Sequence, residues 1–87
     1  MKNYYFGQDG KILDGDKLAS IGEIDYLYIT DMTAFEDFAF KNHMETLGAD
    51  EPNIFYYWDN ENDLWNWVED DDIIDRLDRA IIDFDNK

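Results

Sequence analysis

The sequence predicts an α+β fold, in which a small, mostly antiparallel sheet of about three or four strands is covered by two amphipathic helices. Short segments around 24–30 and 53–58 are rich in aromatic and β-branched residues, as strands are, and the first of them also alternates between two faces. Segments at about 34–47 and 71–84 instead repeat apolar residues at helical spacing. With 17% aromatic residues in a chain of 87, large rings can build one dense core, so residues 1–87 are expected to form a single domain.

The strand segments are identified by β-branched and aromatic residues bounded by turn residues. Near the N-terminus "NYYF" and "KIL" flank "GQDG", a pattern typical of a hairpin. "IDYLYIT" is the strongest strand segment, and "NIFYYW" is the second. A short helical turn is expected at 18–22, whereas "DNENDLWNWV" fits either a hairpin loop or a short helix. The order of the strands in the sheet does not follow from these patterns.

The first helix is predicted from a capping box and an apolar stripe. Thr33 and Glu36 have the spacing at which two side chains satisfy each other's backbone N–H groups, so the helix is expected to begin there. Gly48 is expected to end it in the left-handed conformation. His43 follows Ala39 on the apolar stripe, which indicates a histidine in the core or at its boundary.

The C-terminal helix has one apolar face and one acidic face. Its apolar side is formed by Ile73, Ile74, Leu77, Ala80, Ile81 and Phe84, which have the spacing of a helix that buries one side. The opposite face carries aspartates, and Arg76 and Arg79 are the only basic residues among them. The acids that begin the helix, at 70–72, also suit the positive end of its dipole.

The charge of the chain restricts its partners. Its 22 acidic and 7 basic residues give a net charge of −15. Such a charge repels nucleic acids and membrane surfaces, so we expect no direct binding to either and a basic protein as partner. The chain has no cysteine and no apolar stretch typical of a signal peptide or membrane span, which favours a cytoplasmic protein.

No pattern in the sequence is typical of an enzyme. Ser20 is the only serine, and nothing around it resembles a nucleophile elbow. His43 is the only histidine, and without cysteine a Cys–His pair is impossible. We therefore expect no catalytic residues and no enzymatic activity.

The segment "DNEND" partly matches a calcium-binding loop. Asp59, Glu61 and Asp63 stand at the first three ligand positions. The sixth position is Leu64 where a glycine is needed, and the twelfth is Asp70 where a glutamate is typical. A polar turn is the better interpretation, and no metal or cofactor is expected.

The acidic helix face is interpreted as a decoy for nucleic acid. Acids three or four residues apart on a helix have Cβ atoms about 5–6 Å apart, comparable to phosphates along one strand. An ordinary solvated face is the alternative, but such a face normally mixes both charge signs, whereas this one is nearly single-signed. Trp65 is expected as an exposed aromatic anchor. The acids at Asp59, Glu61, Asp63 and Glu69 would form a second row if the loop that carries them packs alongside the helix. The candidate partner-binding residues are Asp59, Glu61, Asp63, Trp65, Glu69, Asp70, Asp71, Asp72, Asp75, Asp78, Asp83 and Asp85.

With its acidic helix "VEDDDIIDRLDRAIIDFD" and its abundant Tyr and Trp, the chain resembles the small acidic inhibitors made by phages and mobile elements. These include anti-CRISPR and anti-restriction proteins that mimic DNA, and inhibitors of uracil-DNA glycosylase. The resemblance implies a non-enzymatic inhibitor, monomeric or homodimeric, that acts in the host cytoplasm. Its partner would be a basic nucleic-acid-binding protein, such as a Cas nuclease or complex or a restriction enzyme.

Two alternatives stay open at this point. The first is an immunity protein, a class that is also small and acidic, which neutralises a basic nuclease toxin. "YYWDNENDLWNWVE" is faintly similar to the region around the binding helix of the barnase inhibitor barstar, but this similarity is not carried over to the chain. The remainder of the chain does not follow that layout. The second is an acidic interaction domain without an inhibitory role.

Overall fold

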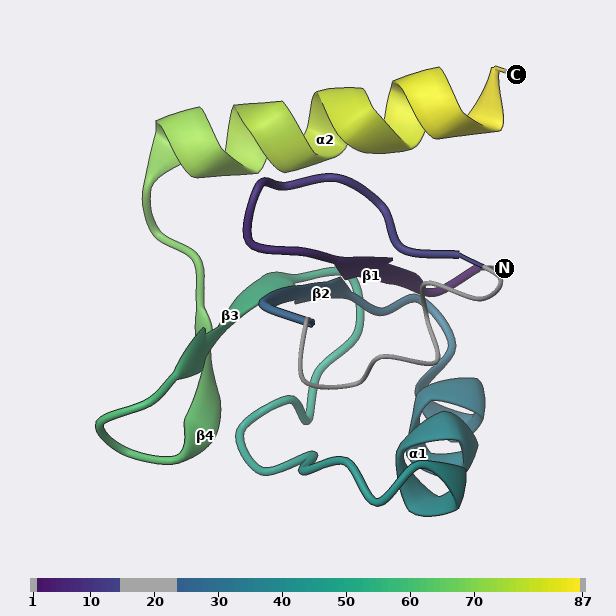
Figure 1. The fold of residues 1–87 in the computed structure, drawn as a ribbon, viewed down its shortest axis with the longest axis vertical. Coiled ribbons are helices and arrows are strands. Elements are labelled where there is room, and N and C mark those ends of the chain that lie inside the picture. Colours follow the sequence, from purple (N-terminus) through teal and green to yellow (C-terminus); the bar gives the residue numbers. More distant parts are fainter. Residues whose placement is uncertain (1, 15–23, 87) are drawn as a thin grey trace.

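The computed structural model describes residues 2–14 and 24–86, and the helical turn expected at 18–22 lies outside them. It contains a four-stranded antiparallel sheet and two helices (Figure 1), which confirms the predicted α+β class. The strands follow one another in the order β1-β2-β3-β4, each antiparallel to its neighbour. The elements are β1 Tyr4–Phe6, β2 Tyr26–Tyr28, α1 Met32–Lys41, β3 Phe55–Asp59, β4 Leu64–Trp67 and α2 Asp71–Asp85.

The sheet lies between the two helices, with α2 on one face and α1 on the other (Figure 1). Successive side chains of a strand point to opposite faces, so β1 contributes to two cores. One core lies on the α1 side and contains Tyr5, Ile24, Leu27, Ile29, Phe35, Ala49, Tyr56 and Trp65. The other lies beneath α2 and is formed by Tyr4, Phe6 and Leu77, with partly buried residues such as Phe55 and Phe84 around them.

The segment 7–14 follows β1 and fills the space beneath α2 (Figure 1). It turns back through a hydrogen bond from Gly10 N to Gly7 O at 3.0 Å. The predicted strand "KIL" is reduced to a single bridge between Ile12 and Phe6, with Leu13 N donating to Tyr5 O at 2.8 Å. The segment "DNENDLWNWV", which the sequence left ambiguous, forms the β3–β4 hairpin.

Helix α1 differs from the prediction at both ends. Its N-cap is Asp31, whose carboxylate accepts a hydrogen bond from Ala34 N at 3.1 Å, so the expected Thr33–Glu36 capping box does not begin the helix. The helix ends at Lys41, not at 47, because the next backbone N–H groups turn back onto its last carbonyls: His43 N donates to Phe40 O at 3.4 Å and Met44 N donates to Ala39 O at 2.8 Å. These two bonds around a left-handed residue form a Schellman motif, and the Asn42 side chain adds a bond to the carbonyl of Phe38 at 2.8 Å.

His43, two residues after the end of α1, is exposed, so its predicted position in the core or at its boundary is wrong. Its backbone has a φ of 55°, in the left-handed region that few residues other than glycine adopt. The chain reverses direction here, which removes His43 from the apolar stripe that a continuous helix would have formed.

Gly48 does adopt the left-handed conformation, but in the loop that packs against β4. Its φ is 93°, and an added Cβ would collide with the carbonyl oxygen of Trp65. The preceding residue is bonded to the same tryptophan, since Trp65 N donates to Leu47 O at 2.8 Å. Only glycine therefore permits this close approach of loop and strand.

Substitution of Gly48 tests this packing. We expect Gly48→Ala to lower the free energy of unfolding by at least about 2 kcal/mol, since it combines backbone strain with a clash against backbone atoms. Gly10→Ala is the matched control: its φ is also positive, at 80°, but the nearest atom is the flexible Cδ of Arg76 at 3.1 Å. Urea unfolding should show that the control lowers the free energy of unfolding by only about 1 kcal/mol. Equal losses in both variants would contradict a specific role for the Trp65 contact.

Candidate functional site

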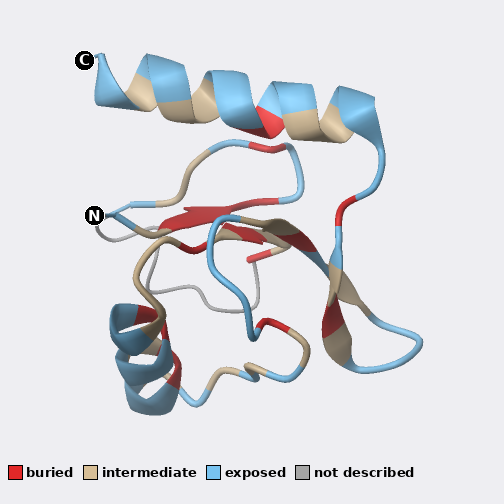
Figure 2. Cartoon of the chain, turned by 180° about the vertical axis from the view of Figure 1, so that it is seen from behind, coloured by how far each residue is buried: buried red, intermediate tan, exposed pale blue. Residues whose placement is uncertain are grey.

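Helix α2 is fixed to the sheet along its apolar face. Leu77 is fully buried against the core of Tyr4 and Phe6. At the start of the helix, the Asp70 carboxylate accepts hydrogen bonds from Asp72 N at 2.9 Å and Ile73 N at 3.4 Å. The helix is about 22 Å long at 1.5 Å per residue, and its outer face is exposed (Figure 2).

Three exposed aspartates follow one line along the outer face. Asp71, Asp75 and Asp78 are separated by four and three residues, the spacing of side chains that lie one above another on a helix. We call these three residues the acidic strip. Asp75 forms an ion pair with Arg79 at 3.2 Å, but both side chains are more than half exposed, so the pair is weak and screened by salt.

Four further charges of α2 lie on the neighbouring line. Asp72, Arg76, Arg79 and Asp83 follow each other at helical spacing. They border a shallow groove of about 360 Å³ between α2 and the loop at 9–11, which contributes Asp9 and Lys11. This side of the helix is therefore of mixed sign, and the predicted row through Asp72 is divided between two lines.

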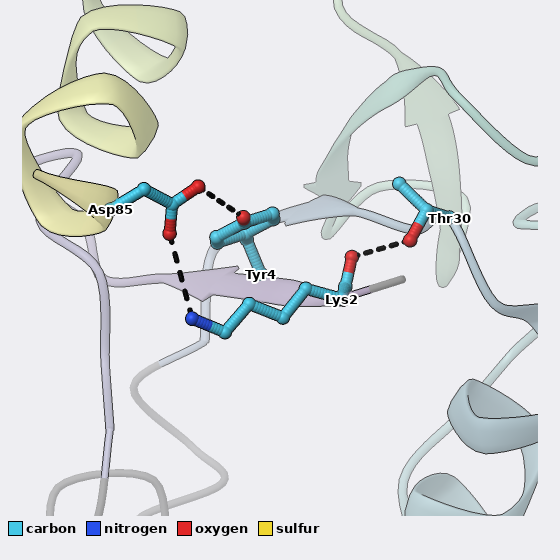
Figure 3. Close-up of polar contacts among 4 residues, drawn as sticks. All are labelled: Lys2, Tyr4, Thr30 and Asp85. Atoms are coloured by element: carbon cyan, nitrogen blue, oxygen red, sulfur yellow. Dashed lines mark hydrogen bonds and ion pairs between the residues drawn. The ribbon is translucent and has the colours of Figure 1, made fainter.

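Asp85, at the end of α2, is engaged within the protein. Its carboxylate accepts a hydrogen bond from the Tyr4 hydroxyl at 2.7 Å and lies 3.5 Å from Lys2 Nζ (Figure 3). The backbone carbonyl of Lys2 in turn accepts a hydrogen bond from the Thr30 hydroxyl. Asp85 thus ties the end of the helix to the beginning of the sheet, whereas the sequence placed it in the binding row.

The β3–β4 turn does not extend the acidic surface of α2, which corrects the expected second row. Its tip lies at the opposite side of the molecule from the helix in both views (Figures 1 and 2). The Asp59 carboxylate organises the turn itself, since it accepts hydrogen bonds from the side chains of Asn62 and Asn66 at 2.8 Å each. The bond from Asn62 is the main cause that lowers the Asp59 pKa. Glu61 and Asp63 are exposed at this distant tip, and Glu69 lies just before α2.

Trp65 is buried, so its prediction as an exposed anchor is wrong. It is only 3% exposed, packs edge-on against Trp58, and donates its indole N–H to Glu45 O at 2.8 Å. Trp67 is 51% exposed instead. Both tryptophans point to the same face of β4, but the loop at 44–49 covers only the first. Residues two apart in a strand point to the same face, so the alternation pattern could not show that Trp65 is buried and Trp67 exposed.

A second apolar residue missed by the sequence analysis lies within the acidic surface. Ile82 continues the line of the acidic strip and is 51% exposed. The sequence pattern assigned α2 a purely charged outer face, so this residue gave no signal of its own. An exposed isoleucine beside carboxylates gives the surface an apolar contact point.

No family model, no curated protein and no solved structure matches the chain. Among residues 2–14 and 24–86, no three histidine, aspartate or glutamate side chains are grouped so that they could hold a metal ion. In the same part of the chain, neither helix has the length and apolar character needed to cross a membrane.

Tyr4 links α2 to the alkaline stability of the fold. Burial, and next the hydrogen bond to Asp85, raise its pKa to about 12, from 10.0. An acid whose pKa is raised by folding keeps its proton more tightly in the folded state, so its stabilisation is present below pH 10 and is lost as the pH rises through 12. We expect the stability difference between wild type and Tyr4→Phe to shrink by on the order of 1 kcal/mol between pH 8 and 11. Urea unfolding at both pH values measures this, and an unchanged difference would contradict it.

The two last aspartates of α2 should respond oppositely to substitution. Asp85→Ala removes the bond to Tyr4 and should lower the free energy of unfolding by about 1 kcal/mol. Asp83→Ala removes a carboxylate from the negative end of the helix dipole and should be neutral or stabilising by up to about 0.5 kcal/mol. Thermal unfolding measures the stability of the two variants, and the comparison is fair because both change the net charge by the same amount. A larger loss for Asp83→Ala would contradict the assigned roles.

Proposed function

We propose that this protein is a non-enzymatic inhibitor that presents the acidic strip of α2 to the nucleic-acid-binding groove of a basic protein. The partner is a Cas nuclease or complex, or a restriction enzyme, in the cytoplasm of a host cell. The observation that carries the proposal is the exposed line of Asp71, Asp75 and Asp78 on a helix whose opposite face is docked on the sheet. A net charge of −15 supports a basic partner.

The charge spacing of the strip supports a decoy of a single phosphate backbone. At a rise of 1.5 Å per residue, its three carboxylates are spaced at about 5 Å along the helix axis. Phosphates of one DNA strand are spaced at about 3.4 Å along the duplex axis. Because a strand winds around the duplex axis, its neighbouring phosphates lie farther apart in space than this rise, so the spacing of the strip is comparable to that of one strand and less dense than that of a duplex. A partner groove that contacts one strand backbone matches it best.

The position of the acids also supports a role beyond folding. The last turn of α2 contains no basic residue but carries Asp83 and Asp85, at the end of the helix where carboxylates are unfavourable. Asp85 is compensated by Tyr4 and Lys2. Asp83 has no such bond among those found for the described residues, and the helix dipole disfavours its charge at this position. Local features that oppose stability are typical of functional surfaces.

Reversal of the strip tests the proposal. The variant with Asp71, Asp75 and Asp78 changed to Lys should weaken binding to the partner at least tenfold, because attraction becomes repulsion at the interface. Binding is measured by displacement of a labelled DNA duplex from a panel of Cas nucleases and restriction enzymes. Circular dichroism checks that the variant is folded.

A matched control separates the strip from net charge. Glu36, Asp37 and Glu45 are exposed on or just after α1, and Asp37 pairs with Lys41 at 3.2 Å, as Asp75 does with Arg79. Changing these three to Lys alters net charge equally and should leave displacement nearly intact. If both triple variants lose the same affinity, or if the wild type displaces DNA from no enzyme of the panel, the proposal is overturned. Selective inhibition of a nuclease toxin would assign the strip to immunity instead.

A further inference from the structure

A small groove lies where the end of β4 leads into α2. It has a volume of about 270 Å³ and is lined by Tyr26, Tyr57, Trp67, Val68, Glu69, Asp70 and Ile73. Figure 1 shows the connecting segment that rises from β4 to α2 and bounds this region. The volume suits one long side chain rather than a folded peptide segment. None of the Lys and Arg residues that the structure describes lines the groove.

Two tyrosines form the floor of the groove. Tyr26 of β2 and Tyr57 of β3 are direct partners in the antiparallel register. Such partners point to the same face, with Cβ atoms about 4.5–5.5 Å apart. Tyr57 is 39% exposed, which is unusual for a ring beside a core. Their rings offer negatively polarised faces to a cation.

The rim of the groove is anionic despite the helix end beside it. A helix N-terminus carries about half a positive charge and by itself favours anions. Here Glu69 and Asp70 line the groove, and Asp70 already accepts two of the free backbone N–H groups. Two carboxylates outweigh the half charge, so the groove attracts a cation and repels a phosphate.

We propose that this groove holds an arginine side chain of the basic partner. The inference rests on the proposed function and adds the residue by which the partner is anchored. A planar guanidinium can lie against a tyrosine ring while its N–H groups pair with a carboxylate, whereas an ammonium group is more strongly hydrated and cannot stack. Asp71 follows Asp70 directly and begins the acidic strip, so one basic surface can reach both the strip and the groove.

Three short peptides test the groove without any nuclease. They are acetyl-Gly-X-Gly-amide with X as arginine, lysine or citrulline, which is the neutral isostere of arginine. In two-dimensional NMR titrations at constant ionic strength, we expect saturable shifts of Tyr26, Tyr57 and Ile73 with arginine. Lysine should bind at least threefold more weakly, and citrulline should give no saturable shift. Equal binding of citrulline, or shifts confined to the acidic strip, would overturn the proposal.

Two variants and their matched controls locate the binding. Tyr57→Leu and Glu69→Gln should each lower the affinity for the arginine peptide at least fivefold. The controls Phe40→Leu and Glu36→Gln change an exposed ring and an exposed carboxylate on α1, where Phe40 is 83% exposed, and should change affinity less than twofold. Glu69 is exposed, so its variant remains informative if Tyr57→Leu fails to fold. Equal effects in variants and controls would reject the groove.

The two proposals can fail separately. If the arginine peptide binds as expected but no enzyme is displaced from DNA, the groove stands and the inhibitor role falls. If displacement depends on the acidic strip but the peptide does not bind the groove, only the arginine anchor is rejected.

Discussion

The packing of α2 on β1 is the interaction on which the rest of the structure depends. Leu77 is the only fully buried residue of the helix, and it lies against Tyr4 and Phe6. Burial of one such side chain contributes roughly 1.5–3 kcal/mol. Repulsion between neighbouring aspartates in water is below about 1 kcal/mol per pair. Leu77 and the partly buried side chains around it offset this repulsion, and the acids remain on the outer face with both ends of the helix held by Asp70 and Asp85.

Strand β1 can support α2 because its own edge is covered. It is the first strand in the sheet order, yet all three of its residues are buried. The segment at 7–14 folds back over it through the Leu13–Tyr5 hydrogen bond and fills the space under α2. Tyr5 points to the other face, where it stacks on Phe38 of α1 at 4.4 Å between ring centroids. One short strand thus contributes side chains to both cores.

The sequence predicted best what depends on residues close together in the chain. The apolar spacing of 71–84 identified α2 within one residue, because that period has no competing interpretation. The end of α1 was missed because it depends on the left-handed conformation of His43 and on the backbone bonds that close around it, which periodicity does not record. Strand order and the burial of Trp65 depend on contacts between distant segments. For the same reason the groove at Tyr26 and Tyr57 could not be predicted, as its two rings are brought together only by the register of β2 and β3.

The acidic strip and the tyrosine groove would contribute differently to a complex. Exposed carboxylates act over about a Debye length, roughly 10 Å at 0.1 M salt, so the strip governs how fast a basic surface is attracted. An arginine side chain held against the tyrosine rings would be desolvated and would have to leave before the complex separates, so the groove would govern how long the complex lasts. Salt would then slow association mainly through the strip, while loss of the groove would speed dissociation at any salt concentration. A surface that had only the strip would bind every basic protein, and selectivity among them requires a shaped contact of this kind.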